Sequence, residues 1–173
     1  MGKVIGIISV KGGVGKTSCT SNIGAALAYQ HGKKVLLIDA NFSAPNLGLH
    51  LGVVDPGMTI HDVMLGKCSI LQSVYEYDDN LHLIPAKLNY RKRIEYKNFK
   101  SKLNRLKKKY DYILLDSSPS LNSEIKATLD ASDSLFVITT ADFPTIATTI
   151  STVNEAAAFK KPVLGLIVNK YNR

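Results

Sequence analysis

One stretch decides the fold of this 173-residue chain: Ser9-Val10-Lys11-Gly12-Gly13-Val14-Gly15-Lys16-Thr17-Ser18. It follows the apolar, β-rich run Val4–Ile8 and leads into residues of helical composition. A strand, a glycine-rich turn and a helix are the context that a phosphate-binding loop needs. Glycines let successive N–H groups point at an anion, and the helix N-terminus adds partial positive charge. The stretch therefore predicts a phosphate-binding loop, with Lys16 on the β- and γ-phosphates and the Thr17 hydroxyl on Mg²⁺.

Two details make this loop more specific. Val10 stands where the pattern G-x-x-x-x-G-K-[ST] has its first glycine, and a second lysine, Lys11, opens the loop. The run Lys11–Thr17 resembles the deviant Walker A signature of the MinD/ParA family of P-loop ATPases. The resemblance implies that Lys11 reaches across a homodimer interface to the partner's nucleotide. Taken alone, Lys11 would more simply be a solvated lysine beside a tight turn, whereas the whole run Lys11–Thr17 favours the family role. The nucleotide-binding residues implied in the loop are Lys11, Gly12, Gly13, Val14, Gly15, Lys16, Thr17 and Ser18.

Composition and length place the chain among globular proteins of one domain. Hydrophobic residues make up 45% of the sequence and charged residues 21%, as in soluble domains. No apolar run approaches the length of a membrane span, and the N-terminus lacks a secretory pattern. Cys19 and Cys68 lie far apart, which favours a reducing compartment and no metal cluster. We expect a cytoplasmic protein with a single nucleotide-binding domain over residues 1–173.

Strand-like and helical stretches alternate along the chain, which predicts an α/β fold with a mainly parallel central sheet flanked by helices in three layers. Together with the loop and the resemblance, this pattern predicts a P-loop NTPase fold. Parallel strands with right-handed crossovers bring the loops after the strands to one edge. Four such loops carry informative residues: Val10–Lys16, Asp39–Leu51, Asp116–Leu121 and Thr140–Pro144. The expected strands are 3–9, 34–38, 81–85, 111–115, 134–139 and 163–168, and the expected helices are 16–31, 59–66, 94–109, 122–131 and 145–159.

Asp39 ends the apolar strand 34–38, and the loop after it resembles the Switch I segment of the family, Asp-x-Asp. Here the motif reads Asp39-Ala40-Asn41. The resemblance implies that Asp39 holds Mg²⁺ through water, whereas Asp39 alone could be a helix cap or a loop residue. The second aspartate of the family orients or activates the attacking water. Asn41 cannot accept a proton but can still orient water, which predicts slow hydrolysis rather than none. The catalytic residues implied are Lys11, Lys16, Asp39 and Asn41.

Two further strand ends carry site candidates. Asp116, followed by Ser117-Ser118-Pro119, resembles the Walker B and Switch II motif, which implies that Asp116 holds Mg²⁺ through water. Its alternative role is an N-cap, for which Ser120 or Asn122 is better suited. Asn169 ends the last strand, where the family reads the adenine edge, although asparagine is also an ordinary turn residue. The segments 46–52 and 115–119 look closest to archaeal MinD-like proteins.

The basic charge of the chain is concentrated in one segment, Arg91–Lys109. It holds ten of the 22 lysines and arginines and one of the 14 acids, whereas the whole chain carries +8. The segment predicts a helix over 94–109 with an apolar stripe of Ile94, Phe99, Leu103 and Leu106. The ordinary alternative is a solvated surface helix, although a face built only for solubility would mix both signs of charge. Non-specific DNA contact through Arg91–Lys109 is therefore one alternative, and anionic lipid is another, although an anchor needs an exposed apolar face.

The combined interpretation is an ATP-binding, nucleotide-dependent dimerising switch ATPase with Mg²⁺, acting in spatial positioning such as division-site placement or partition of chromosomes or plasmids. The alternatives are a nucleotide-binding scaffold without hydrolysis and a metal-cluster carrier of the same superfamily. Neither Cys19 nor Cys68 has the spacing that a cluster carrier needs. Members of the family are usually longer, and the C-terminal amphipathic helix by which MinD attaches to membranes is not in this sequence. We therefore do not expect membrane attachment by this chain, and its activating partner protein is not identified.

Overall fold

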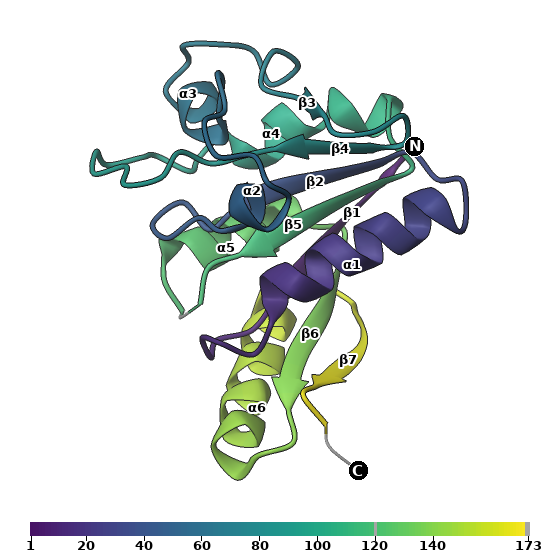
Figure 1. The fold of residues 1–173 in the computed structure, drawn as a ribbon. Helices are drawn as coiled ribbons and strands as arrows, with labels where there is room; N and C mark the ends of the chain where they lie inside the picture. Colours follow the sequence, from purple (N-terminus) through teal and green to yellow (C-terminus); the bar gives the residue numbers. More distant parts are fainter. Residues whose placement is uncertain (120, 172–173) are drawn as a thin grey trace.

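The computed structural model describes residues 1–119 and 121–171, which form a sheet of seven strands with helices around it (Figure 1). In chain order the strands are β1 (Lys3–Ile8), β2 (Val35–Ala40), β3 (Tyr75–Glu76), β4 (Leu81–Ile84), β5 (Tyr112–Ser117), β6 (Ser134–Thr140) and β7 (Val163–Asn169). The helices are α1 (Lys16–Tyr29), α2 (Leu47–His50), α3 (Ile60–Met64), α4 (Phe99–Leu103), the 3₁₀-helix η1 (Leu106–Lys108), α5 (Ser123–Ala131) and α6 (Phe143–Ala158).

The strand order across the sheet is β3-β4-β2-β5-β1-β6-β7. All neighbouring pairs are parallel except β3 with β4, which is antiparallel. The prediction of a mainly parallel sheet is therefore confirmed. The register of β2 on β5 sets Asp39 opposite Asp116, so these two strands bring the two carboxylates to the same edge.

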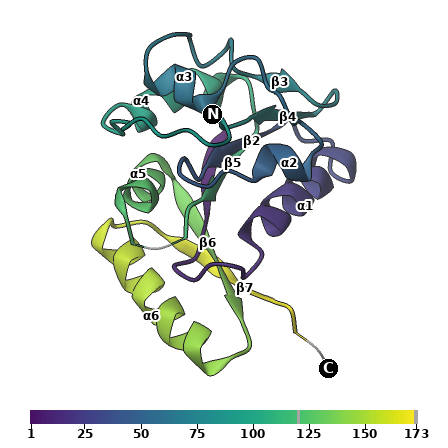
Figure 2. The same cartoon turned by 60° about the vertical axis from the view of Figure 1, so that its left-hand side comes forward.

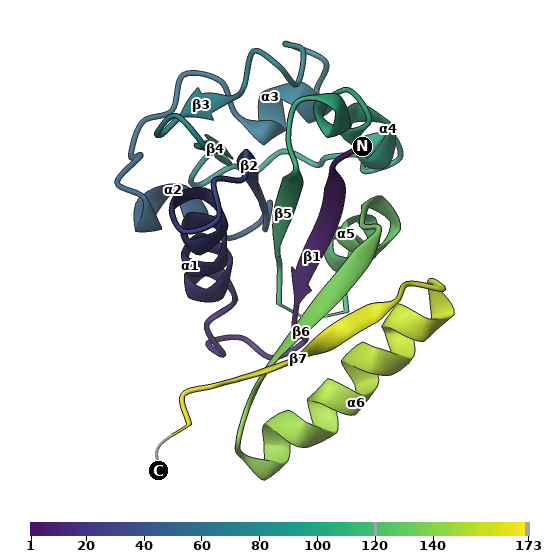
Figure 3. The same cartoon turned by 90° about the vertical axis from the view of Figure 1, so that its right-hand side faces the viewer.

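Helices cover both faces of the sheet, as expected for a three-layer fold. Figure 3 shows α1 on one face and α5 and α6 on the other. On β1, Ile5 and Ile7 join the apolar cluster on the α1 face, whereas Ile8 joins the cluster with α5 and α6. All six residues of β2 are buried, as is typical of a parallel strand covered on both faces.

The six strands and five helices expected from the sequence all have counterparts, but the helix expected over 94–109 is wrong in extent. Residues 91–98 form no helix, and α4 covers only Phe99–Leu103 before η1. The apolar residues are buried as expected, yet Ile94 lies five positions before Phe99, which does not fit a helical stripe. Asn98 and Asn104 flank α4, and asparagine favours turns over helix interiors.

The N-cap of α5 is Asn122, whose side chain accepts hydrogen bonds from the N–H groups of Glu124 and Ile125. This assigns the cap to one of the two candidates, and the other, Ser120, lies outside the described residues. Asp116 is thereby left for another role. Among residues 1–119 and 121–171, no helix has both the length and the apolar character needed to cross a bilayer.

Candidate functional site

The glycine loop joins the end of β1 to the start of α1 at the carboxyl edge of the sheet (Figure 2). Gly13 and Gly15 have positive φ angles of 73° and 96°, which few other residues adopt. Lys16 is only 7% exposed, and its Nζ donates to the Lys11 carbonyl at 3.3 Å. Burial lowers the pKa of the Lys16 amine, while the negative charge of Asp116 opposes that shift. The loop thus holds a buried cation beside a backbone shaped to receive an anion.

A cavity of about 330 Å³ opens in front of this loop. The structure brings residues from four loops to its wall, including Asn41 from the loop after β2 and Asn169 from the end of β7. Of the residues expected from the sequence, the wall contains Gly12, Gly13, Gly15, Lys16, Thr17, Ser18, Asn41 and Asn169. The wall also contains residues to which sequence reasoning gave no role, namely Asn46, His50, Ser117, Pro119 and Lys170.

Asp116 lies beneath this cavity, 1% exposed, and contacts the first turn of α1. The Thr17 hydroxyl donates to Asp116 Oδ2 at 2.7 Å, and the Thr20 hydroxyl lies 3.5 Å from Oδ1. Burial raises the pKa of Asp116 to about 6, against the opposing effect of its Thr17 hydrogen bond and of Lys16. The neighbouring Ser117 Oγ is buried without a hydrogen-bond partner among the described residues. The Thr17 hydroxyl and the buried Asp116 carboxylate are oxygen ligands of the kind that Mg²⁺ prefers. The raised pKa of Asp116 indicates that the neighbouring groups do not fully balance its negative charge.

Asp39 is fully buried and is turned toward its own loop. Its Oδ1 accepts a hydrogen bond from the Asn41 N–H at 3.1 Å, and Oδ2 accepts from the N–H groups of Asn46 and Leu47 at 3.0 Å. Leu47 begins α2, so Asp39 fixes the path of the chain from β2 into that helix. Its carboxylate therefore does what a helix cap does, in addition to lying opposite Asp116.

Asn41 is 7% exposed and lies at the wall of the cavity. Its Nδ2 donates to the Ala44 carbonyl at 2.5 Å, and its Oδ1 accepts from the Ala44 N–H at 3.3 Å. The next residue, Phe42, packs against Tyr96 and Phe99 with ring centroids 5.1 and 5.7 Å away. The loop after β2 is thus anchored on one side by an aromatic cluster, and its amide side chain engages its own backbone.

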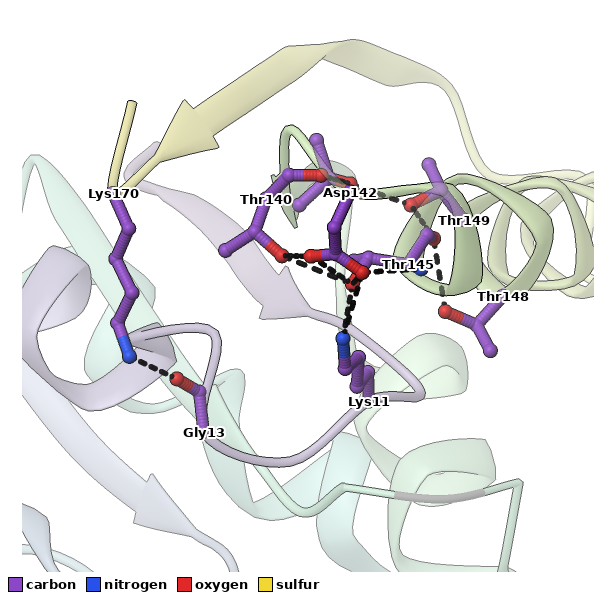
Figure 4. A network of polar contacts seen from close by, with 9 residues as sticks. Lys11, Gly13, Thr140, Asp142, Thr145, Thr148, Thr149 and Lys170 are labelled. Atoms are coloured by element: carbon purple, nitrogen blue, oxygen red, sulfur yellow. Dashed lines mark hydrogen bonds and ion pairs between the residues drawn. The ribbon is translucent and has the colours of Figure 1, made fainter. Parts of the chain in front are cut away.

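Lys11 does not point into the cavity that contains Lys16. Its Nζ donates to Asp142 Oδ1 at 3.0 Å and to the Thr145 hydroxyl at 2.5 Å. Both partners lie at the start of α6 (Figure 4). Lys11 and Asp142 line a second cavity, of about 450 Å³. Sequence reasoning singled out the loop 140–144 but gave Asp142 no role. The spacing of Asp142, Pro144 and Thr145 is a helix-start pattern that could have identified the cap.

The end of β7 holds the glycine loop from the other side. Asn169 Nδ2 donates to the Val14 carbonyl at 2.8 Å, and Lys170 Nζ donates to the Gly13 carbonyl at 2.8 Å (Figure 4 shows the latter). A Cβ atom at Gly15 would lie 2.2 Å from Asn169 Nδ2, whereas one at Gly13 would meet nothing within 4 Å. Asn169 therefore supports the phosphate loop in this structure, and only Gly15 allows that contact.

We expect Gly15→Ala to be more destabilising than Gly13→Ala, although both residues have positive φ. The backbone term alone costs about 1–2 kcal/mol in the free energy of unfolding. In Gly15→Ala the Asn169 side chain must also move away and lose its hydrogen bond to the Val14 carbonyl, which adds about 0.5–1.5 kcal/mol. Urea unfolding of both variants measures the difference, and equal losses would contradict a supporting contact between Asn169 and the loop.

We also expect the stabilisation by Mg²⁺ to grow with pH. Burial, followed by the charge of Asp116, raises the pKa of Asp39 from 3.8 to about 8. A group with a raised pKa contributes stability that is present below its unfolded pKa and is lost as the pH rises through the folded pKa. The metal-free chain should therefore lose stability between about pH 4 and pH 8, and a bound cation should offset this loss because it favours the ionised carboxylates.

Thermal unfolding with EDTA and with Mg²⁺, at about pH 6 and at pH 8.5, measures this dependence. A sodium salt at equal ionic strength controls for screening. A Mg²⁺ effect of the same size at both pH values would contradict the expectation.

The comparisons with known proteins agree with this geometry. A family model described as an AAA domain matches residues 2–161. The septum site-determining protein MinD of Synechocystis sp. is 34% identical over 174 residues, covering 98% of this chain and 65% of that protein. The structure of the cell division ATPase MinD of Pyrococcus furiosus has a TM-score of 0.94 at 30% identity, covering 100% of this chain and 74% of its own.

A second solved structure, MinD of Pyrococcus horikoshii OT3 complexed with Mg-ADP, has a TM-score of 0.93 at 29% identity and covers 100% of this chain and 72% of its own. The chain spans 65% of the length of the first curated relatives that it matches. Because the family model matches nearly the whole chain and the P. furiosus MinD structure superposes on all of it, the chain belongs to the MinD/ParA family of P-loop ATPases.

Proposed function

We propose that this chain binds MgATP at the carboxyl edge of the sheet and acts as a nucleotide-dependent dimerising switch with slow ATP hydrolysis. The observation that supports it most is the contact of the Thr17 hydroxyl with Asp116 at 2.7 Å, beside the buried Lys16. Hydroxyl, carboxylate and lysine then stand at the N-terminus of α1, where an anion is stabilised. The relatives named as septum site-determining proteins support a role in spatial positioning, such as division-site placement or partition.

The residues of the proposed site divide between phosphate binding, metal binding and orientation of water. Lys16 and the N–H groups of the glycine loop hold the phosphates, and Thr17 and Asp116 hold Mg²⁺. Mg²⁺, when bound, neutralises the charge of the phosphate oxygens. Asp39 keeps the loop after β2 in place and adds charge near the metal site. Asn41 orients the attacking water without accepting its proton, which makes hydrolysis slow.

Phosphate release tests the enzymatic part of the proposal. With MgATP we expect slow release that stops when EDTA removes Mg²⁺, because phosphoryl transfer depends on neutralising phosphate charge. A chain that binds ATP, as measured by titration calorimetry, yet releases no phosphate would contradict the ATPase. That result would support the second candidate, a nucleotide-binding scaffold, which is favoured by the presence of Asn41 at the motif position.

The basic segment supports a further proposal, contact with the phosphate backbone of DNA. Lys100 and Lys107 pair with Asp130 and Asp133 at 3.3 and 2.7 Å, whereas Arg91, Lys92 and Arg93 are exposed on a loop. We therefore assign the contact to the loop rather than to a helix face. Filter binding of arbitrary duplex DNA should show retention that falls steeply with salt. Absence of retention at low salt would contradict it.

A further inference from the structure

The Lys11 side chain points toward Asp142 and Thr145 (Figure 4) and does not line the cavity around Lys16. Its ammonium group contacts Asp142 Oδ1 at 3.0 Å and the Thr145 hydroxyl at 2.5 Å. Asp142 also accepts hydrogen bonds from the hydroxyls of Thr140 and Thr145. Lys11 is thereby bound to the β6–α6 connection, 131 residues farther along the same chain.

We infer that Asp142 and Thr145 form a latch that holds Lys11 within its own chain, and that pairing of two ATP-bound copies requires this latch to open. The inference rests on the proposed function, in which Lys11 contacts the nucleotide of a second copy. One ammonium group cannot serve both positions, because its contacts in the latch direct it toward α6. Intramolecular capture of Lys11 therefore competes directly with pairing.

The backbone around Lys11 is held independently of its side chain. The Val10 N–H donates to the Thr152 hydroxyl at 3.3 Å, and the Lys11 carbonyl accepts from Lys16 Nζ at 3.3 Å. On the far limb of the loop, the Gly13 carbonyl accepts from Lys170. Opening the latch therefore needs only rotation of the Lys11 side chain and leaves the phosphate loop in place.

Asp142 stays in position when Lys11 leaves, because it also caps α6. Its Oδ1 accepts a hydrogen bond from the Thr145 N–H at 3.0 Å. The hydroxyls of Thr140 and Thr145, followed by Lys11, hold the pKa of Asp142 well below its usual range. The carboxylate is therefore charged at physiological pH and ready to recapture Lys11.

The latch is weak enough to be reversible. The side chains of Lys11 and Asp142 are 38% and 43% exposed, and exposed ion pairs contribute little because water and salt screen them. We expect the latch to lower the population of chains with an unbound Lys11 side chain by roughly 3- to 5-fold. Since a dimer requires two open latches, the pairing constant should change by roughly the square of that factor, about 10- to 25-fold.

The variant Asp142→Asn tests the latch in the monomer. Asparagine keeps a side-chain oxygen for the cap but loses the charge that attracts Lys11. Pulse acetylation followed by peptide mass spectrometry measures the reactivity of Lys11 relative to the exposed Lys33. We expect it to rise roughly 3- to 5-fold in the variant, in line with the strength of an exposed ion pair. Asp130→Asn, which breaks the exposed pair with Lys100 at 3.3 Å, is the matched control and should leave Lys11 unchanged.

Pairing is measured by sedimentation velocity with Mg²⁺ and a non-hydrolysable ATP analogue. Asp142→Asn should pair at about 10- to 25-fold lower concentration than the wild type and Asp130→Asn. Unchanged Lys11 reactivity, or unchanged pairing when the wild type does pair, overturns the latch. If both proteins stay monomeric, the proposed dimerisation is contradicted, and the acetylation comparison alone decides whether Asp142 holds Lys11.

Discussion

Lys16→Ala is expected to lower the affinity for MgADP by roughly 10- to 150-fold, because a hydrogen bond from a charged group contributes about 1.5–3 kcal/mol. Lys16 is only 7% exposed and stands at the N-terminus of α1. In the proposed site it supplies the positive charge that faces the phosphates. Using MgADP rather than MgATP separates this effect from pairing and from hydrolysis.

The loss of affinity should not come from unfolding. Burial lowers the pKa of the Lys16 amine, which means that burying the charged amine is unfavourable in the nucleotide-free protein. Lys16→Ala is therefore expected to keep its thermal unfolding temperature, as measured by circular dichroism. Titration calorimetry measures the affinity, and Lys33→Ala, at an exposed position before β2, is the control. An affinity within about 3-fold of the wild type would contradict the role of Lys16, since it corresponds to less than 1 kcal/mol.

Asn41→Asp is expected to raise the rate of phosphate release by about 10- to 100-fold. A general base typically contributes 10²- to 10⁴-fold, and we place the gain at or below the lower end because Asp39 and Asp116 crowd the site with negative charge. The substitution also replaces the contact between Asn41 Nδ2 and the Ala44 carbonyl with repulsion between two oxygens. That repulsion frees the side chain from its own loop.

Asn46→Asp is the matched control for this variant. Asn46 lines the same cavity, and its Nδ2 donates to the same Ala44 carbonyl at 3.2 Å. The two substitutions thus change charge identically at neighbouring positions. If phosphate release stays at the wild-type rate in Asn41→Asp, or rises equally in both variants, Asn41 is not the limiting group.

The fold was predictable because its signals are local. The glycine loop and the apolar strands ending in Asp39 and Asp116 each occupy a short stretch, and parallel topology then brings the strand ends together. The prediction of one helix over 94–109 was wrong because it treated the apolar residues as one helical stripe, although Ile94 and Phe99 are five residues apart. Burial of these apolar residues is a tertiary outcome that does not require a continuous helix.

The contacts of the site were less predictable, because they join residues far apart in the sequence. Nothing near Lys11 indicates that Asp142 will accept its hydrogen bond, and nothing near Gly15 indicates that Asn169 will lie against it. The three hydrogen bonds from backbone N–H groups to Asp39 depend on the path of the loop after β2. One-dimensional patterns identify residue types, whereas these partnerships follow from how the loops fold onto the sheet edge.

Light scattering of the purified chain with Mg²⁺ and either ADP or a non-hydrolysable ATP analogue tests the central claim most directly. The γ-phosphate should shift the population from one chain to two, because in the proposed switch only the triphosphate offers the group that Lys11 would contact across the interface. We predict a monomer with ADP, a dimer with the analogue, and a monomer under both conditions for Lys11→Ala. A wild-type chain with the same mass under both conditions would contradict the proposed switch.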